Sequence, residues 1–183
     1  MPVPPPEREC HCLRCEPPRW WRRPGTRDAA NVRMVGTHGW AVTGVFGDPA
    51  GEWAYSIGLW HTFGSPELCL VGVPHQYATR YVNTVAGQIR DGDPLEPGRV
   101  RTGVMGGHHD TLGIAPVHDS WYPRLFGAAI DYYQRPPFPM VQLVWPDGSG
   151  RFLWDPEVHD GNRDRQPSLF LPLDQAAAPW QDR

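Results

Sequence analysis

The chain has 183 residues, of which 40% are hydrophobic and 20% are charged. This composition is ordinary for a globular protein with one main core. The net charge of −3 argues against a nucleic-acid-binding domain, because such domains are usually clearly basic. No apolar run approaches the ~18 residues of a membrane-spanning helix, and the proline-rich start does not resemble a secretory signal. Three of the four cysteines crowd into residues 10–15, which is a poor framework for disulfides, so we expect a protein of the reducing cytoplasm without a membrane segment.

Residues 1–30 are rich in Cys, Pro and Arg and show neither the period of a helix nor that of a strand. We therefore predict a flexible arm over this range. Within it, residues 19–27 read RWWRRPGTR, with four arginines around two tryptophans. Such a run could contact phosphates and stack on bases. Its flanking prolines favour a solvated arm, so we do not expect nucleic acid as a partner.

The segments between residues 40 and 74 predict three strands. Residues 40–45 alternate between two faces, and a Gly-Asp-Pro turn follows at residues 47–49. The stretch EWAYSIGLW then places aromatic and aliphatic side chains on one face, with the small residues Ala54, Ser56 and Gly58 on the other. This bare face lets another element approach closely, and we expect such an approach at Gly58. Residues 68–74, LCLVGVP, form a continuous apolar run that is typical of a buried strand.

Two later segments show the apolar spacing of helices. Residues 75–92 carry Val82 and Val85 at this spacing, with Gly92 where a C-terminal cap belongs. Pro123 begins a second, shorter helix, because proline suits the first turn and apolar residues follow at helical intervals. We therefore predict two helices in this part of the chain.

The remaining strands are predicted in pairs. Residues 98–107 and 112–118 indicate one pair, and residues 139–147 predict a strand that forms a hairpin with residues 150–156. Residues 159–183 are proline-rich, and we expect them to run over the surface as a tail. The whole order predicts a single α+β domain over residues 31–158. It consists of a mainly antiparallel sheet of about six to seven strands with two helices packed on it.

Two motifs resemble those of a bacterial family. The first is WAYSIGLWHTFGSPELCLVGVP at residues 53–74, which a predicted helix follows, and the second is QLVWPDGSGRFLWD at residues 142–155. Together they resemble the domain-of-unknown-function family numbered 4262, whose members show a Gly-x-Pro-Glu-Leu turn and a Gln-Leu-Val-Trp-Pro-Asp hairpin. The resemblance covers most of the chain and implies a bacterial protein, but it implies no activity.

The predicted arm contains a candidate metal site. The motif ECHCLRC places Cys10, Cys12 and Cys15 close together, with His11 between the first two. Thiolates at this spacing can bind Zn²⁺, but a structural zinc site normally has four ligands. The fourth ligand could be His11, Cys69 or a histidine elsewhere. The alternative is an unstructured tail with reduced thiols.

His61 and Glu67 lie on either side of a Gly-Ser-Pro turn and form a second candidate site. One hypothesis makes Glu67 a general acid or base whose pKa is raised by burial, with His61 opposite it. The other makes Glu67 a carboxylate that accepts hydrogen bonds from backbone or arginine donors and fixes the turn. We favour the second, because buried carboxylates commonly satisfy backbone donors. We expect this turn to lie beside Trp145 and Asp147.

A cluster of histidines forms a third, weaker candidate. His108, His109, Asp110 and His118 could form a site if a hairpin folds them together. Adjacent side chains on a strand end point in different directions, so the two neighbouring histidines cannot readily bind one metal ion. A polar turn is therefore the preferred interpretation.

The aromatic residues indicate a ligand-binding cleft. Nine tryptophans exceed what one core usually needs, and an apolar pocket with few polar groups is the usual form of a small-molecule site. We therefore expect a small-molecule or peptide binding module with a Trp-rich cleft. The residues expected in this cleft are Tyr55, Trp60, His61, Glu67, Trp145, Asp147 and Trp154. The alternative is a metal-assisted enzyme that uses His61 and Glu67 with further histidines.

Overall fold

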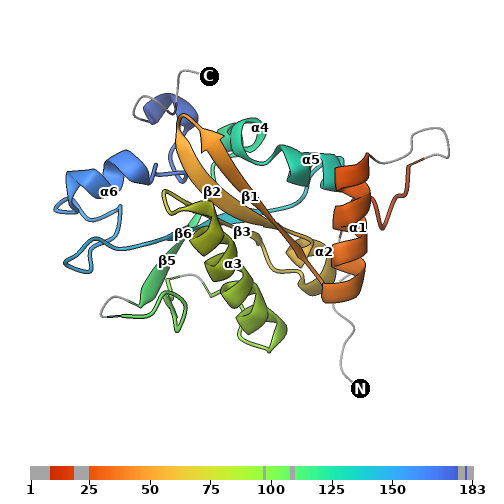
Figure 1. Cartoon of the computed structure of the whole chain (residues 1–183), viewed down its shortest axis with the longest axis horizontal. Coiled ribbons are helices and arrows are strands. Elements are labelled where there is room, and N and C mark those ends of the chain that lie inside the picture. The colour runs from red at the N-terminus through yellow and green to blue at the C-terminus, as the bar shows by residue number, and fades with distance from the viewer. Residues whose placement is uncertain (1–8, 19–24, 97, 108–109, 177–179, 181–183) are drawn as a thin grey trace.

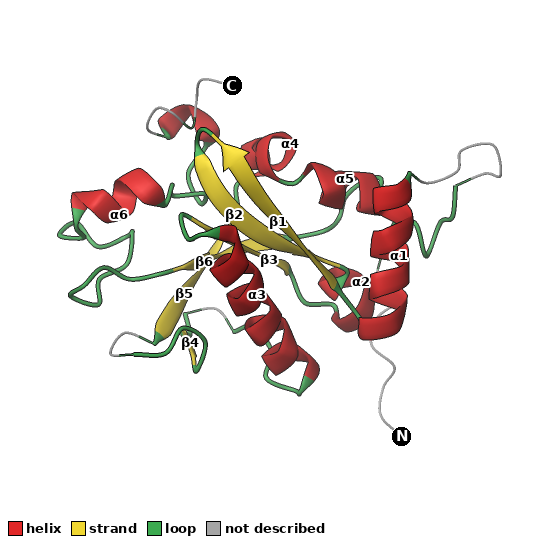
Figure 2. Cartoon of the chain, viewed as in Figure 1, coloured by secondary structure: helices red, strands yellow, loops and turns green. Residues whose placement is uncertain are grey.

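The computed structural model describes residues 9–18, 25–96, 98–107, 110–176 and 180 of the chain. These residues form an α+β fold with a six-stranded sheet and six α-helices (Figures 1 and 2). The α+β class is confirmed, whereas the predicted number of two helices is too small. None of the helices in the described ranges is both long enough and apolar enough to cross a membrane.

The strands of the sheet follow the order β1-β2-β3-β6-β5-β4. They are β1 (Ala41–Asp48), β2 (Gly51–Ile57), β3 (Glu67–Val71), β4 (Arg101–Thr102), β5 (Thr111–Pro116) and β6 (Met140–Val144). Neighbours pair antiparallel except β3 and β6, which are parallel. The sheet is therefore mixed, and the prediction of a mainly antiparallel sheet is only partly right. The parallel pair arises because a long connection separates β3 from β6, so local turns do not set their direction.

Residues 150–156 do not form the predicted hairpin with β6. They lie in turns and loop, and the N–H of Asp147 donates to the carbonyl of Arg151 at 2.8 Å. The reason lies in the strand order, because β6 has β3 on one side and β5 on the other and so has no free edge. Trp154 lies over β5 instead, where its ring occupies the space beside Gly113.

Helix α3 (His75–Arg90) covers one face of the sheet and lies in front of it in Figure 1. It corresponds to the helix predicted over residues 75–92. Its buried residues recur at helical spacing and are Ala78, Val82, Val85, Ala86 and Ile89. They pack in one cluster with Ala54 of β2 and with Leu68 and Leu70 of β3. The bare face predicted for β2 therefore accommodates this helix.

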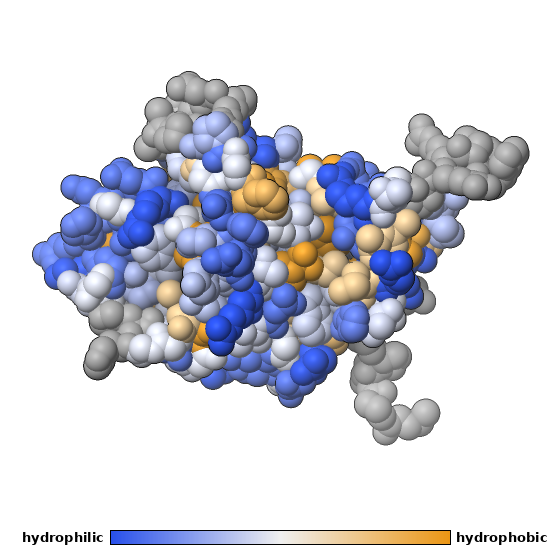
Figure 3. Space-filling view, in the orientation of Figure 1, coloured by the Kyte–Doolittle hydropathy of each residue, from blue (hydrophilic) through white to orange (hydrophobic). Residues whose placement is uncertain are grey.

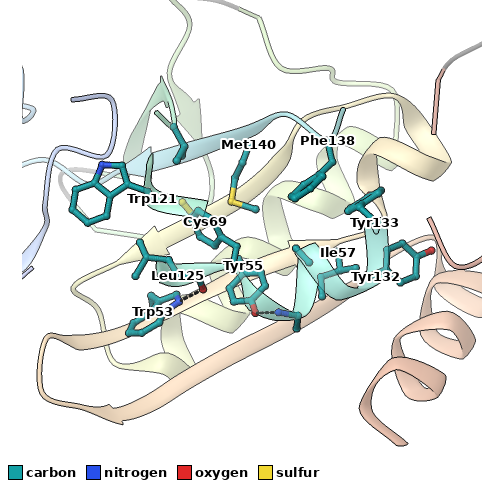
Figure 4. Close-up of a cluster of buried hydrophobic side chains, with 14 of the residues drawn as sticks. Trp53, Tyr55, Ile57, Cys69, Trp121, Leu125, Tyr132, Tyr133, Phe138 and Met140 are labelled. Atoms are coloured by element: carbon teal, nitrogen blue, oxygen red, sulfur yellow. Dashed lines mark hydrogen bonds between the residues drawn. The ribbon is translucent and has the colours of Figure 1, made fainter. Parts of the chain in front are cut away.

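The opposite face of the sheet packs against α4 (Tyr122–Leu125) and α5 (Gly127–Tyr133) and carries the larger aromatic core (Figure 4). Trp53 and Tyr55 of β2 contribute to this core, and the indole N–H of Trp53 donates to the carbonyl of Leu125 at 3.1 Å. The short helix predicted from Pro123 is thus two helices, which meet at Phe126.

Helix α1 (Thr26–His38) begins inside the predicted arm and was not predicted. Only Asn31 and Val35 of this helix are buried, so its sequence shows almost no apolar period. Val35 lies against Gly58, where an added Cβ would come within 2.6 Å of the Val35 side chain. The predicted close approach at Gly58 is therefore confirmed.

Parts of both predicted terminal segments pack on the domain. Cys12 is fully buried and belongs to the aromatic core. At the other end, α6 (Asp160–Arg165) precedes Leu169 and Trp180, which are buried in the same core. Residues on both sides of the predicted domain limits thus contribute to one folded unit.

The outer surface over α3 and α6 is mainly hydrophilic (Figure 3).

Candidate functional site

Cys10, Cys12, Cys15 and His61 come together in the structure. They form a candidate site for a metal ion, which we call the metal centre. Its four ligand atoms, three sulfurs and one ring nitrogen, all lie within 4.8 Å of one another. The cysteines are those of the predicted metal motif, and His61 is carried by the short helix α2 (Leu59–Phe63). Thiolate and imidazole ligands at this spacing could hold a metal ion.

The distances from His61 match a tetrahedral ligand set. Its Nδ1 lies 3.8 Å from the sulfur of Cys10, 3.4 Å from that of Cys12 and 3.3 Å from that of Cys15. With Zn–S bonds of about 2.3 Å and Zn–N bonds of about 2.0 Å, the sulfur and nitrogen ligands of a tetrahedron lie about 3.5 Å apart. One ring nitrogen carries a single proton or a single lone pair, so it cannot hydrogen-bond to three thiols at once. A cation shared by the four ligands would account for all three distances.

The other candidates for the fourth ligand make different contacts. The ring nitrogens of His11 lie 2.8 Å from Glu9 and 2.6 Å from Glu16. Cys69 is fully buried in β3, where burial raises the pKa of its thiol. The remaining option, a histidine from elsewhere in the chain, is the one that the structure brings to the cysteines.

Two local features of the backbone position the ligands of the metal centre. The N–H of Cys15 donates to the carbonyl of Cys12 at 3.0 Å, which forms the turn that gathers the thiols. On the other side, α2 begins after Gly58 and ends at Gly64, and their φ angles of 111° and 67° are positive. Glycine adopts such angles without steric cost, so the chain can enter and leave this very short helix abruptly. The histidine is thereby held next to the thiol turn.

The thiolate of Cys12 is stabilised by its neighbours. Burial opposes its ionisation, but hydrogen bonds from His61 and from two backbone N–H groups of its own turn, together with the nearby Tyr132 hydroxyl, lower the pKa of Cys12 to about 6. The Tyr132 hydroxyl is buried and has no hydrogen-bond partner of normal geometry among the described residues. By contrast, burial raises the pKa of Cys10 to about 12. A bound cation favours the thiolate form of all three cysteines.

Glu67 follows the C-terminal end of α2 and is fully buried. Its Oε1 accepts hydrogen bonds from the N–H groups of Gly58 at 2.9 Å and Trp60 at 3.0 Å. The hydroxyl of Ser56 donates to its Oε2 at 2.5 Å, and that of Tyr133 donates to Oε1. Burial raises the pKa of Glu67, and these four donors act against that rise. The predicted backbone donors are therefore present, and the carboxyl group ties the start of α2 to the sheet and to α5.

The other residues predicted for the cleft do not gather around His61. Tyr55 and Trp145 are buried in the two opposite cores of the sheet. Asp147 accepts hydrogen bonds from backbone N–H groups of the turn that follows it, and Trp154 is half exposed near β5. The expected contact between the Glu67 turn and Trp145 is wrong. Glu67 pairs with the first residue of β6, whereas Trp145 follows the last one.

Asp110 and His118, the described members of the predicted histidine cluster, do not belong to the metal centre. His108 and His109 lie outside the described residues. Asp110 accepts hydrogen bonds from two backbone N–H groups of its own loop, and His118 caps a short 3-10 helix. The described members therefore make local structural contacts.

A pocket of about 650 Å³ lies beside the metal centre. Trp60, Tyr122 and Phe138 supply its aromatic walls, and Gln134 and Arg135 lie on the side that contacts the thiol turn. Of these residues, only Trp60 was predicted. The sequence RPPFP at residues 135–139 is the signal that could have indicated the rest. Prolines fix the backbone and present a rigid apolar surface beside an aromatic ring.

Comparison with protein families identifies the domain. A family model described as a domain of unknown function, DUF4262, matches residues 34–159. The chain belongs to this family. The match confirms the resemblance carried by the two sequence motifs. No curated protein and no solved structure matches the chain. His61, Glu67 and the pocket lie within the DUF4262 residues, whereas the three cysteines of the metal centre precede them.

Proposed function

We propose that this DUF4262 protein is a zinc-stabilised binding module whose ligand site is the pocket beside Trp60. The observation that carries the proposal is the pocket itself. Its volume of about 650 Å³ falls in the range of small-molecule sites, and its walls are aromatic and proline side chains with few polar groups. A small, mostly apolar molecule suits such a lining.

Zinc is the metal that fits the ligand set best. Three thiolates and one imidazole are a common combination at structural zinc sites, and soft sulfur ligands disfavour magnesium and calcium. The centre joins a turn near the N-terminus to α2, which are 46 residues apart between Cys15 and His61. Its role in this proposal is to fasten that turn onto the domain.

A metal-assisted enzyme is the second candidate and has less support. A catalytic zinc site keeps one coordination position for water or substrate, whereas the four protein ligands here would fill all positions of a tetrahedron. Glu67 is fully buried and its oxygens accept hydrogen bonds from four donors. It is therefore poorly placed to exchange protons with a substrate.

The proposal can be tested with the dye anilinonaphthalene sulfonate, an apolar ring system with one negative charge. We expect saturable binding of one dye per zinc-loaded chain. Ile130→Trp fills the pocket, so it should weaken dye binding at least tenfold. Met34→Trp is the matched control, because it places the same indole on α1, at a position that is 40% exposed and outside the pocket.

Fluorescence titration measures the dye affinity, and the melting temperature shows that both variants remain folded. Equal dye affinity in the parent and in both variants would contradict the proposal. So would the absence of saturable binding to the parent.

A further inference from the structure

The metal centre and the pocket share a wall, and we infer that metal binding and ligand binding are coupled through it. A bound zinc ion fixes the positions of Trp60 and Gln134, so the zinc-loaded protein takes its apolar ligand more tightly than the metal-free protein. This inference rests on the proposed function, because it concerns the regulation of the same pocket.

Trp60 is the first connection between the two sites. Its ring lines the pocket, and the next residue, His61, is a ligand of the metal centre. Its indole N–H donates to the carbonyl of Glu9 at 3.1 Å, directly before the ligand Cys10. The indole is thus attached on both sides to residues that adjoin metal ligands. Its position in the pocket wall therefore depends on how those ligands are held.

Gln134 is the second connection. Its side-chain amide donates to the carbonyls of His11 and Glu16 at 2.9 Å each, and both carbonyls belong to the turn that carries the thiols. The backbone of Gln134 has a φ of 63°, and no other non-glycine residue in the described ranges has a positive φ. Such a conformation persists only where the surroundings hold it. The thiol turn supplies that hold, and Gln134 in turn lines the pocket.

Arg135 adds a weaker contact at the same wall. Its guanidinium lies 2.8 Å from the carboxylate of Glu16, but both side chains are about half exposed, so the pair contributes little to stability. Arg135 and Asp119 are the charged residues of the pocket lining. The coupling is therefore carried by Trp60 and Gln134 and not by this ion pair.

Removing the metal ion should loosen the wall without detaching it. His61 alone can satisfy only one of the three thiols, so the thiol turn loses most of its attachment to α2. The turn keeps its contact with α5, where the N–H of Leu13 donates to the carbonyl of Tyr132 at 2.8 Å. Thermodynamic linkage then requires a pocket ligand to raise the zinc affinity by the same factor by which zinc raises the ligand affinity.

The experiment measures both affinities with anilinonaphthalene sulfonate and zinc as the probes. Dye titrations compare the zinc-loaded protein with protein from which zinc has been removed, and a competing chelator reports the zinc affinity with and without saturating dye. We expect the dye to bind at least tenfold more tightly in the presence of zinc. The zinc affinity should rise by the same factor in the presence of dye.

A pair of glutamine variants tests the coupling in protein that keeps its zinc. Gln134→Ala removes the two hydrogen bonds to the thiol turn and should weaken dye binding severalfold at full zinc occupancy. Gln88→Ala is the matched control, because Gln88 also donates to a backbone carbonyl, that of Thr102 at 2.9 Å, but it does not line this pocket. We expect Gln88→Ala to bind the dye like the parent.

The outcomes separate this inference from the proposed function. Saturable dye binding that is equal with and without zinc, in protein that circular dichroism shows to be folded, would overturn the coupling and leave the binding module intact. If the metal-free protein unfolds, equal dye affinity in zinc-loaded Gln134→Ala and Gln88→Ala would overturn it. No saturable binding to the zinc-loaded parent would overturn the proposed function, and the coupling with it.

Discussion

Two polar sites lie at the short helix α2, and they differ in whether the protein itself supplies enough hydrogen-bond partners. After the helix, Glu67 is fully buried and accepts hydrogen bonds from two backbone N–H groups and two hydroxyls. Within the helix, His61 faces three thiols with one ring nitrogen. Protein donors satisfy the first site, whereas one ring nitrogen does not suffice for the three thiols of the second, where a bound cation would supply the missing partner. The number of partners that a polar group finds in the protein thus separates a structural role from that of a candidate metal ligand.

Chelation of zinc should lower the stability of the folded state more than any of the substitutions described below. At a free zinc concentration about 1,000 times the dissociation constant, binding stabilises the folded state by about 4 kcal/mol. For a chain of this size, that corresponds to a melting temperature ~10 °C higher with zinc than after treatment with a chelator. Differential scanning calorimetry with and without chelator measures the shift.

Cys69→Ala is the matched control for the loss of a thiol. Cys69 is buried in β3 and lies outside the metal centre. This variant should therefore show the same shift on chelation, whereas Cys12→Ser should show almost none. A full shift in Cys12→Ser would mean that the chelator acts elsewhere.

Gly58→Val should have the next largest effect, because Gly58 adjoins both sites. It precedes the helix that carries His61, and its N–H donates to Glu67. An added Cβ would lie 2.6 Å from Val35, so we expect a loss of about 3 kcal/mol from overpacking and from a strained φ of 111°. Urea unfolding measures this loss.

Gly92→Val separates the two causes of that loss. Gly92 has a similar φ of 97°, but an added Cβ there would meet nothing within 4 Å. Its cost should therefore be smaller than that of Gly58→Val. Equal costs would show that Val35 moves aside and that only the backbone angle matters.

Glu67→Gln should cost about 2 kcal/mol, because a neutral amide weakens the charge-assisted hydrogen bonds and turns one acceptor into a donor. It should leave the zinc content unchanged, whereas His61→Ala should abolish zinc binding. Urea unfolding and metal analysis of the two variants test this difference. Stabilisation by Glu67→Gln would favour the catalytic hypothesis for this carboxylate.

The smallest effect is expected at Asp147, a carboxylate with backbone donors like those of Glu67. Hydrogen bonds from the N–H groups of Arg151, His159 and Ser149 lower the pKa of Asp147 from its usual value near 3.8. Its stabilising contribution is therefore present above pH 3.8 and lost as the pH falls through the lowered pKa. The stability of Asp147→Asn should therefore fall slightly less than that of the parent as the pH is lowered. Melting temperatures of both proteins between about pH 5 and about pH 2.5 test this expectation. Identical pH dependence in the two proteins would contradict it.

The parts of the fold that were predictable are those with strong local patterns. The alternation in β2 and the helical spacing in α3 predicted both elements, and the small side chains of β2 predicted close packing at Gly58. Helix α1 was missed because only two of its residues are buried. The parallel pairing of β3 with β6 was missed because a long connection carries no local signal of strand order.

Only those ligands of the candidate site that lie close together in the sequence were predictable. The spacing of the three cysteines indicated a metal site, but their fourth ligand could not be chosen among the histidines and Cys69, because tertiary packing decides which side chain arrives. His61 was predicted as a site residue in a different role, opposite Glu67. The pocket was missed except for Trp60, because its walls come from segments that no sequence period connects.

The metal content of the purified protein tests the central claim most directly. The protein should be produced without a histidine tag and purified without a chelator, and its metals determined by mass spectrometry. The account predicts one zinc ion per chain in the parent, one in Glu67→Gln and none in His61→Ala. A metal-free parent that melts at the same temperature after zinc is added would contradict it, as would a His61→Ala variant that keeps its full zinc content.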